Sequence, residues 1–306
     1  MRKKDGLTKK RSILGEYAKH KYMMIMFVPV IIYYLIFCYV PISGVIIAFK
    51  DYKLGSGMWG GSWSGLKHFK TIFGLPSFWQ VFTNTIIMSF YKLLFGFPAP
   101  ILFAILLNEV RHTIFKKVVQ TISYLPHFVS WVVLTGIFVQ LLSPSTGALN
   151  IIMGTNTHYM ASPEWFRTVV VATSVWQSLG WGSIVYFAAL TSISPELYEA
   201  AIIDGANRFK RIWHITLPSL IPVITIMLIM QIGKLINDDF DQIFNMLSTP
   251  VMKVGDVIST YTYQQGIARM NYSFATAVGL FKNIISVALI VIANAFSKRI
   301  NEYGIW

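Results

Sequence analysis

The sequence predicts an all-α membrane protein with six transmembrane helices. Of its 306 residues, 55% are hydrophobic and only 13% are charged, whereas soluble domains carry roughly 25% charged residues. The mean hydropathy is +0.56, and several long stretches carry no charge. This composition argues against a soluble enzyme, a disordered chain and a disulfide-rich secreted scaffold, and the single cysteine has no partner for an intrachain disulfide.

The positions of the spans follow from the absence of charge. A bilayer core needs about 20 apolar helical residues, and residues 22–49, 168–195 and 212–233 contain no Asp, Glu, Lys or Arg. A fourth charge-free stretch, 118–163, is expected to leave the membrane near Leu142, because turn-forming residues follow. Two further apolar segments each carry one lysine. The six expected spans lie near 22–46, 80–107, 118–142, 168–191, 217–236 and 277–296.

The basic residues predict the orientation of the chain. The segments on the side of the two termini hold 16 Lys and Arg, eight of them in residues 1–21, and the segments on the opposite side hold seven. Positive loops stay inside, so both termini and the loop 192–218 are expected in the cytoplasm, with 1–21 as a basic arm. The net charge of +13 is therefore mostly an orientation signal and indicates no nucleic-acid partner.

The loop between the fourth and fifth spans is the most informative segment. A short helix is expected from Pro195, because proline suits a first helical position. Asp204-Gly205 breaks this helix, and a second short helix carries Arg208 and ends before Pro218. Small residues near the turn permit close approach of another backbone. A solvated amphipathic loop lying on the lipid headgroups is the alternative.

This loop resembles a family signature. Permease subunits of binding-protein-dependent ABC importers carry Glu-Ala-Ala, three residues, Gly, nine residues, Ile, one residue and Leu-Pro. Every anchor of that pattern is present at the same spacing, namely Glu199, Ala200, Ala201, Gly205, Ile215, Leu217 and Pro218. The resemblance implies the type I ABC importer permease fold, with its MetI-like core, as one transmembrane domain over residues 22–306.

Three other segments narrow the resemblance. Residues 108–131, 178–190 and 274–300 resemble the carbohydrate permeases related to the maltose transporter. Within that branch they are similar to the group that imports oligosaccharides released from complex polysaccharides, common in Gram-positive bacteria. This implies a multi-pass protein of the bacterial plasma membrane that translocates an oligosaccharide by alternating access. A non-sugar solute, such as an amino acid, phosphate or a polyamine, is the alternative.

The resemblance also implies partners, because the chain has no Gly-x-x-x-x-Gly-Lys-Ser/Thr loop to hold a nucleotide. These partners are a second homologous permease, two ATP-binding subunits and an extracellular solute-binding lipoprotein. ATP and Mg²⁺ would belong to the ATPase, so this chain is expected to be no enzyme and to carry no cofactor, catalytic residue or metal. The resemblance assigns the docking on the ATPase to Glu199, Ala200, Ala201, Asp204, Gly205 and Arg208.

Three lysines, Lys92, Lys234 and Lys282, fall inside apolar spans. Charge within a membrane is costly, so each is a candidate for function. The alternatives are extension toward an interface and pairing with a neighbouring group. Lys234 and Asp238 are four residues apart, or about one helical turn, and this spacing allows an internal pair.

Candidate sugar contacts lie at the outer end of the fifth span and just before the sixth. Carboxylates, amides and hydroxyls bond to sugar hydroxyls, and aromatic rings stack on sugar faces. The candidates are Asn237, Asp238, Asp239, Asp241, Ser259 and Tyr263, followed by Trp176, Gln177 and Trp181 in the fourth span. A solvated helix end is the alternative for the acidic stretch. Whether the sugar is acidic stays open, because the lysines favour an acidic sugar and the aspartates oppose it.

Two other classes of protein are weighed against the importer. A membrane enzyme would need Asp238, Asp239 and Asp241 to hold Mg²⁺ with a diphosphate. The spacing of the six histidines supports no zinc site on one helix. A passive channel or a scaffold would not need the loop 192–218, whose residues are expected to dock on an ATPase.

Overall fold

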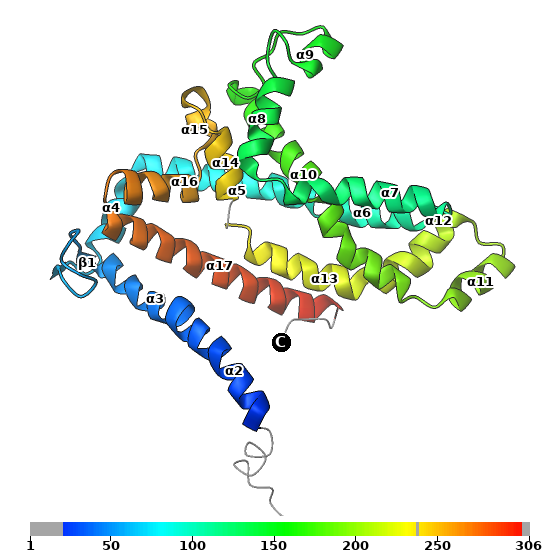
Figure 1. Ribbon diagram of the computed structural model, residues 1–306, viewed down its shortest axis with the longest axis horizontal. Coiled ribbons are helices and arrows are strands. Elements are labelled where there is room, and N and C mark those ends of the chain that lie inside the picture. Colours follow the sequence, from blue (N-terminus) through cyan, green and yellow to red (C-terminus); the bar gives the residue numbers. More distant parts are fainter. Residues whose placement is uncertain (1–20, 237–238, 302–306) are drawn as a thin grey trace, which may run out of the picture.

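The computed structural model describes residues 21–236 and 239–301, and these are overwhelmingly helical (Figure 1). The two strands in this part of the chain, β1 (Lys50–Asp51) and β2 (Ser62–Trp63), form a small antiparallel pair with Lys50 opposite Trp63. Lys67 donates to both carboxylate oxygens of Asp51, at 2.9 and 3.1 Å, and this bond lowers the pKa of Asp51. The hairpin is thereby tied to α4 (Lys67–Gly74), which follows it.

Among the described residues, four helices are long and apolar enough to cross a membrane. The first runs over Lys21–Phe49, and the second, Pro76–Asn108, joins α5 (Pro76–Gly96) to α6 (Pro98–Asn108). The third is Arg208–Gly233, and the fourth is most of α17 (Tyr272–Asn301). The first helix is built from α2 (Lys21–Tyr34), the π turn η1 (Leu35–Tyr39), α3 (Val40–Ile42) and the 3₁₀ turn η2 (Ser43–Phe49).

The span expected at 118–142 is not one straight helix. α7 (Thr113–Tyr124) continues into the 3₁₀ turn η3 (Leu125–Phe128), and α8 (Trp131–Leu141) then leaves at 106° to it. Pro126 has no N–H to donate, and Ser130 is extended and caps α8 by accepting a bond from the Val133 N–H at 3.5 Å. A proline and a new N-cap therefore divide a continuous apolar run into two helices.

The helix at the expected fourth span, α10 (Pro163–Thr191), is 29 residues long but is not among these four helices. At about 1.5 Å per residue it is long enough to cross a bilayer. Counting the bent pair of α7 and α8 as one span gives five crossings by length and composition. The total of six spans stays a prediction, with which this architecture is compatible.

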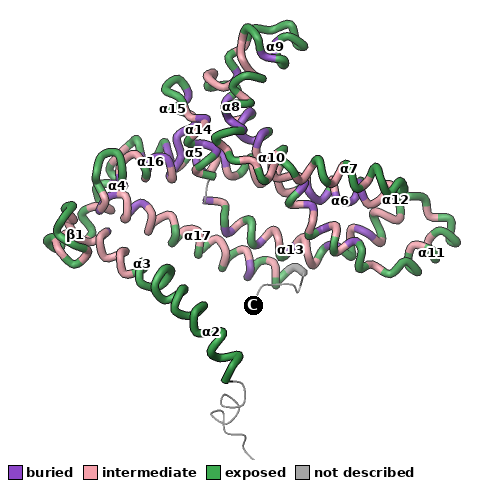
Figure 2. Tube along the Cα trace, viewed as in Figure 1, coloured by how far each residue is buried: buried purple, intermediate pink, exposed green. Residues whose placement is uncertain are grey.

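Helix α10 lies at the centre of the bundle, against α5, α6, α7 and α13 (Leu217–Gly233). A Cβ atom at Gly180 would lie only 2.1 Å from the carbonyl oxygen of Ser123, so this close packing of α7 on α10 requires glycine. α17 packs along α13 and η2. In contrast, α2 has no buried residue and extends away from the bundle, as its exposed colouring in Figure 2 shows.

Short elements complete the described chain. α9 (Ala148–Met153) lies beyond α8, and α11 (Pro195–Ile203) lies at the opposite end of α10 (Figure 1). Between α13 and α17 the elements are α14 (Phe240–Met246), η5 (Thr249–Val251), α15 (Met252–Gly255), α16 (Ile258–Tyr263) and η6 (Gln264–Ala268). α14, α15 and α16 pack on α5, α8 and α10 and so close one end of the bundle.

Candidate functional site

The loop 192–218 forms a rigid turn between two helices. α11 ends at Ile203 with Asp204 as its C-cap, and the Ala206 N–H donates to the Ala201 carbonyl at 2.8 Å while the Gly205 N–H donates to the Ile202 carbonyl at 3.0 Å. This is the Schellman pattern of a helix C-terminus. Gly205 has φ +75°, a left-handed conformation that costs other residues energy. The turn expected at Asp204-Gly205 is present, and it needs glycine for its φ rather than for space, because a Cβ there would meet nothing within 4 Å.

The sequence predicts that the second helix of the loop ends before Pro218, but in the structure this helix continues past the proline. α12 (Arg208–Arg211) is capped by Asn207, whose Oδ1 accepts a bond from the Lys210 N–H at 2.9 Å. It passes through the π turn η4 (Ile212–Thr216) directly into α13. The wider π turn stands just before Pro218, where a regular helix would have to accommodate the proline ring and its missing N–H. One helix therefore links the turn to the membrane bundle.

The loop exposes apolar side chains. All the docking candidates are exposed except Ala201, which is half-buried. Around them the large exposed apolar residues are Leu197, Ile202, Ile203, Phe209 and Trp213. The Tyr198 hydroxyl lies 3.0 Å from the Thr216 hydroxyl and fastens α11 to η4. A concentration of exposed apolar side chains on a braced element is typical of a protein contact surface.

A charged cluster joins three elements inside the bundle. The Lys92 ammonium on α5 donates to Asp239 Oδ2 at 2.8 Å and to Gln242 Oε1 at 2.7 Å. Gln242, fully buried on α14, donates in turn to the Val170 carbonyl at 2.7 Å and the Thr173 hydroxyl at 2.9 Å on α10. Lys92 is thus paired with a neighbouring acid, one of the two alternatives weighed for it. Charge and hydrogen bonds together hold α14 between α5 and α10.

Lys92 and Lys234 face the same small cavity. It has a volume of about 90 Å³ and is lined by Ser89, Lys92, Leu93, Gln231, Lys234, Leu235 and Asp239. Lys234 lies at the end of α13 and Lys92 in the last two turns of α5, so folding brings two separate lysines together. Lys282 lies on α17 and is not part of this lining. The candidates Asn237 and Asp238 lie outside the described residues, and so does the expected Lys234–Asp238 pair.

The two predicted sugar-contact stretches meet through aromatic rings. Tyr263 at the end of α16 lies 5.4 Å from Phe240 and 5.0 Å from Phe244 between ring centroids, and Phe240 and Phe244 stack at 5.0 Å. Asp241 is exposed on α14, and Ser259 is half-buried on α16. Phe244 was missed as a candidate, although it follows Phe240 by one helical turn. The structure therefore unites the stretches 239–242 and 259–265 at one end of the bundle.

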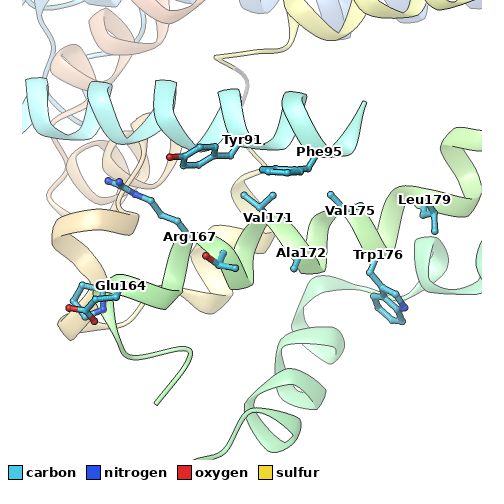
Figure 3. Close-up of a pocket in the computed structure, with 11 residues that line it drawn as sticks. Tyr91, Phe95, Glu164, Arg167, Val171, Ala172, Val175, Trp176 and Leu179 are labelled. Atoms are coloured by element: carbon cyan, nitrogen blue, oxygen red, sulfur yellow. The ribbon is translucent and has the colours of Figure 1, made fainter. Parts of the chain in front are cut away.

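A larger cavity of about 880 Å³ opens between α5 and α10. Its walls are mostly apolar and aromatic, with Tyr91 and Phe95 on one side and Trp176 on the other (Figure 3). Among the third group of sugar candidates, Trp176 lines this cavity. Trp181 instead stacks on His127 at 4.7 Å, and the Gln177 amide donates to the His127 carbonyl at 3.5 Å.

Arg167 reaches from this cavity toward α5. Its guanidinium donates to Asn84 Oδ1 at 2.8 Å and to the Val254 carbonyl at 3.2 Å. Buried Asn84 donates to the carbonyls of Lys253 and Asp256, both at 3.1 Å. The sequence carried no local signal for this network, which ties α5 and α10 to the segment around α15.

Long apolar helices around a charged internal cavity, with a braced helical loop at one end, define a membrane transport protein. Residues 96–302 match the family described as the binding-protein-dependent transport system inner membrane component, and the chain belongs to this family. It is accordingly the multi-pass permease component of a transport system rather than an enzyme, as the signature in loop 192–218 predicted.

Two relatives from Bacillus subtilis (strain 168) are similar over nearly their whole length. Protein LplB is 41% identical over 292 residues, 94% of this chain and 92% of LplB. The polygalacturonan/rhamnogalacturonan transport system permease protein YteP is 39% identical over 302 residues, 97% of this chain and 94% of YteP. A bacterial alginate ABC transporter, solved in complex with an alginate pentasaccharide-bound periplasmic protein, is 38% identical with a TM-score of 0.88, covering 96% of this chain and 99% of the solved chain. These findings confirm the predicted permease fold.

Proposed function

We propose that the chain is the membrane subunit of an ATP-driven importer that carries an oligosaccharide into a bacterial cell. Two relatives named for saccharides, the polygalacturonan/rhamnogalacturonan permease and the alginate importer, support a sugar. They give no support to an amino acid, phosphate or polyamine. The cluster of amide, charged and aromatic groups on α5, α13, α14 and α16 has the chemistry that sugar hydroxyls and ring faces require.

ATP hydrolysis in a partner subunit has to be coupled to movement of the substrate site. The observation that supports this coupling is the continuous helix Arg208–Gly233. Its first turn belongs to the loop 192–218, and its last turn ends beside Lys234 and the small cavity. At about 1.5 Å per residue, this helix is close to 40 Å long. A displacement at the cytoplasmic turn would therefore be passed along this helix to the cavity. The Tyr198–Thr216 hydroxyl contact makes α11 move with this helix.

The proposed cycle uses partners that this chain does not contain. Two ATP-binding subunits hold ATP and Mg²⁺, and one of them receives Glu199, Ala200, Ala201, Asp204, Gly205 and Arg208 in a groove. A second homologous permease completes the translocation path, and an extracellular solute-binding protein delivers the sugar. Closure of the ATPases on ATP pulls the loop and turns the cavity from the cytoplasmic to the outer side. In this orientation both termini are cytoplasmic.

The proposal is tested by deleting the gene and measuring uptake of labelled oligosaccharides by the deletion strain with and without the restored gene. We expect uptake of at least one oligosaccharide to depend on the chain, and purification of the tagged chain to recover a second permease and an ATPase. An active homo-oligomer without an ATPase would refute the importer. Uptake of a non-sugar solute alone would refute the substrate.

The enzyme alternative has a specific objection in the geometry. A Mg²⁺ site made by Asp238, Asp239 and Asp241 would need their carboxylates free for the metal, whereas Asp239 accepts a bond from Lys92.

A further inference from the structure

The small cavity between α5, α13 and α14 carries an excess of positive charge. Its described lining has two cations, Lys92 and Lys234, and one anion, Asp239. An ionisable side chain within a membrane bundle has to be compensated by a partner or by a ligand. The two lysines differ in how far the described residues already compensate them.

Lys92 is already compensated. Its side chain is only 14% exposed, and its ammonium bonds to the Asp239 carboxylate and to the Gln242 amide oxygen. Gln242 is anchored by α10 through two further bonds. Two of the three ammonium donors are therefore in use, and the opposite charge lies 2.8 Å away. This pair neutralises Asp239, one of the aspartates that seemed to oppose an acidic substrate.

Within the described part of the chain, Lys234 makes no ion pair. It is exposed, lines the cavity and forms the C-cap of α13, where its N–H bonds to the Gln231 carbonyl. A lysine here is favoured by the helix dipole, and its flexible stem lets the ammonium follow a moving ligand. Within the described part of the cavity, Lys234 is the cation that an incoming anion meets.

The volume of the cavity restricts what can enter. About 90 Å³ holds a few water-sized groups, whereas pockets that enclose a whole drug-sized ligand measure roughly 300–1,000 Å³. A substituent of a sugar ring enters such a space, and the ring itself stays outside. The aromatic cluster of Phe240, Phe244 and Tyr263 begins one residue after Asp239 and offers a face for that ring.

We propose that Lys234 binds a carboxylate of the transported saccharide, so that the importer selects oligosaccharides built from uronic acids over neutral ones. This inference rests on the proposed function and names the substrate class of the same site. A charge-assisted bond between ammonium and carboxylate is worth about 1.5–3 kcal/mol, which corresponds to about tenfold to a hundredfold in selectivity.

The test uses whole cells that carry the importer with its partners. Labelled trisaccharides of galacturonate, glucuronate, mannuronate and guluronate are each compared with their carboxyl-reduced forms, which keep the linkage and lose the charge. We expect the wild type to take up at least one acidic trisaccharide more than tenfold faster than its reduced form. Lys234→Gln should lower acidic uptake about tenfold or more and leave reduced uptake within about twofold.

Two variants separate binding from structural effects. Lys234→Arg keeps the charge and should retain the preference for the acidic sugar. Lys70→Gln removes an equal charge from an exposed position on α4 and should leave both uptake rates unchanged. Unchanged uptake of the reduced sugar by Lys234→Gln shows that this variant is folded.

The outcomes distinguish this inference from the proposed function. Equal uptake of acidic and reduced trisaccharides by the wild type, equal losses for both in Lys234→Gln, or transport of neutral oligosaccharides alone would overturn the role of Lys234. The oligosaccharide importer would still stand in each of these cases. Failure of the wild type to import any acidic or neutral oligosaccharide would overturn both.

Discussion

The Ala206 N–H donates to the Ala201 carbonyl across 2.8 Å, and this bond closes the turn between α11 and α12. Gly205 lies inside the turn with φ +75°. Two of these three residues belong to the Glu-Ala-Ala…Gly signature, so part of the signature has a backbone role: the carbonyl of Ala201 and the conformation of Gly205 shape the turn. The exposed groups beside them are then free for contact with a partner.

The first prediction concerns this turn. Gly205→Val places a β-branched residue in the left-handed region, at a cost of roughly 1–2 kcal/mol or more, and should shift the turn. We expect uptake to be abolished while the amount of chain in the membrane fraction stays near that of the wild type. Immunoblots of membranes and transport assays on the same cells measure both.

Gly205→Asn is the matched control, because asparagine tolerates positive φ better than valine. It should retain a substantial part of the uptake. Equal activity of the two variants, or equal loss in both, would show that the conformation at Gly205 does not determine coupling.

The sequence predicted the helices well where hydrophobicity alone decides. Long charge-free runs became helices, and the turn predicted at Asp204-Gly205 is present. Boundaries were less predictable, because hydrophobicity reports where lipid begins and backbone hydrogen bonds determine where a helix begins. The sequence predicts that the second helix stops before Pro218, yet the π turn before this proline lets the helix continue from Arg208 to Gly233. Pro126 and Ser130 were the local signals for the bend inside 118–142.

The sequence predicted which charged residues belong to the candidate site, but it did not predict which of them pair with one another. Lys92 and Asp239 both drew attention as charges near apolar spans, but 147 residues separate them. No local pattern pairs positions so far apart, and only the packing of α14 against α5 and α10 does so. The same holds for Asn84 and Arg167, which are 83 residues apart.

The second prediction concerns the network around Asn84. Asn84→Ala removes two bonds to loop carbonyls and one acceptor for Arg167 at a buried position. Leaving buried polar groups without partners costs about 1–3 kcal/mol each. We expect faster hydrogen exchange in the segment 247–258 and a lower unfolding temperature of the purified complex.

Gln80→Ala is the control, because Gln80 is exposed and makes one bond to the same Lys253 carbonyl, at 2.7 Å. Its effect should stay within about 0.5 kcal/mol. Equal hydrogen-exchange rates in the two variants would show that the Asn84 network does not stabilise the segment 247–258.

The third prediction concerns the Lys92–Asp239 pair. Lys92→Met leaves the buried Gln242 oxygen without its donor and should destabilise the complex by about 1–3 kcal/mol. Asp239→Asn should cost less than about 1 kcal/mol, because the Asp239 side chain is 55% exposed and an amide oxygen can still accept. Unfolding temperatures of the single variants and the double variant give the coupling between the two residues. Additive effects would contradict a direct stabilising pair.

The last prediction concerns the bent pair of α7 and α8, on which the number of spans depends. Cys38 is the single cysteine, so Cys38→Ser provides a cysteine-free chain. Into it single cysteines are placed at Thr113, exposed at the start of α7, and at Ile152, 82% exposed on α9. The distribution of positive charge predicts that Thr113 lies in the cytoplasm and Ile152 outside. A membrane-impermeant maleimide should therefore label position 152 in intact cells and label position 113 only after permeabilisation. Labelling of both positions from the same side would make α7 and α8 a re-entrant element, and a chain with both termini in the cytoplasm would then need a different set of spans.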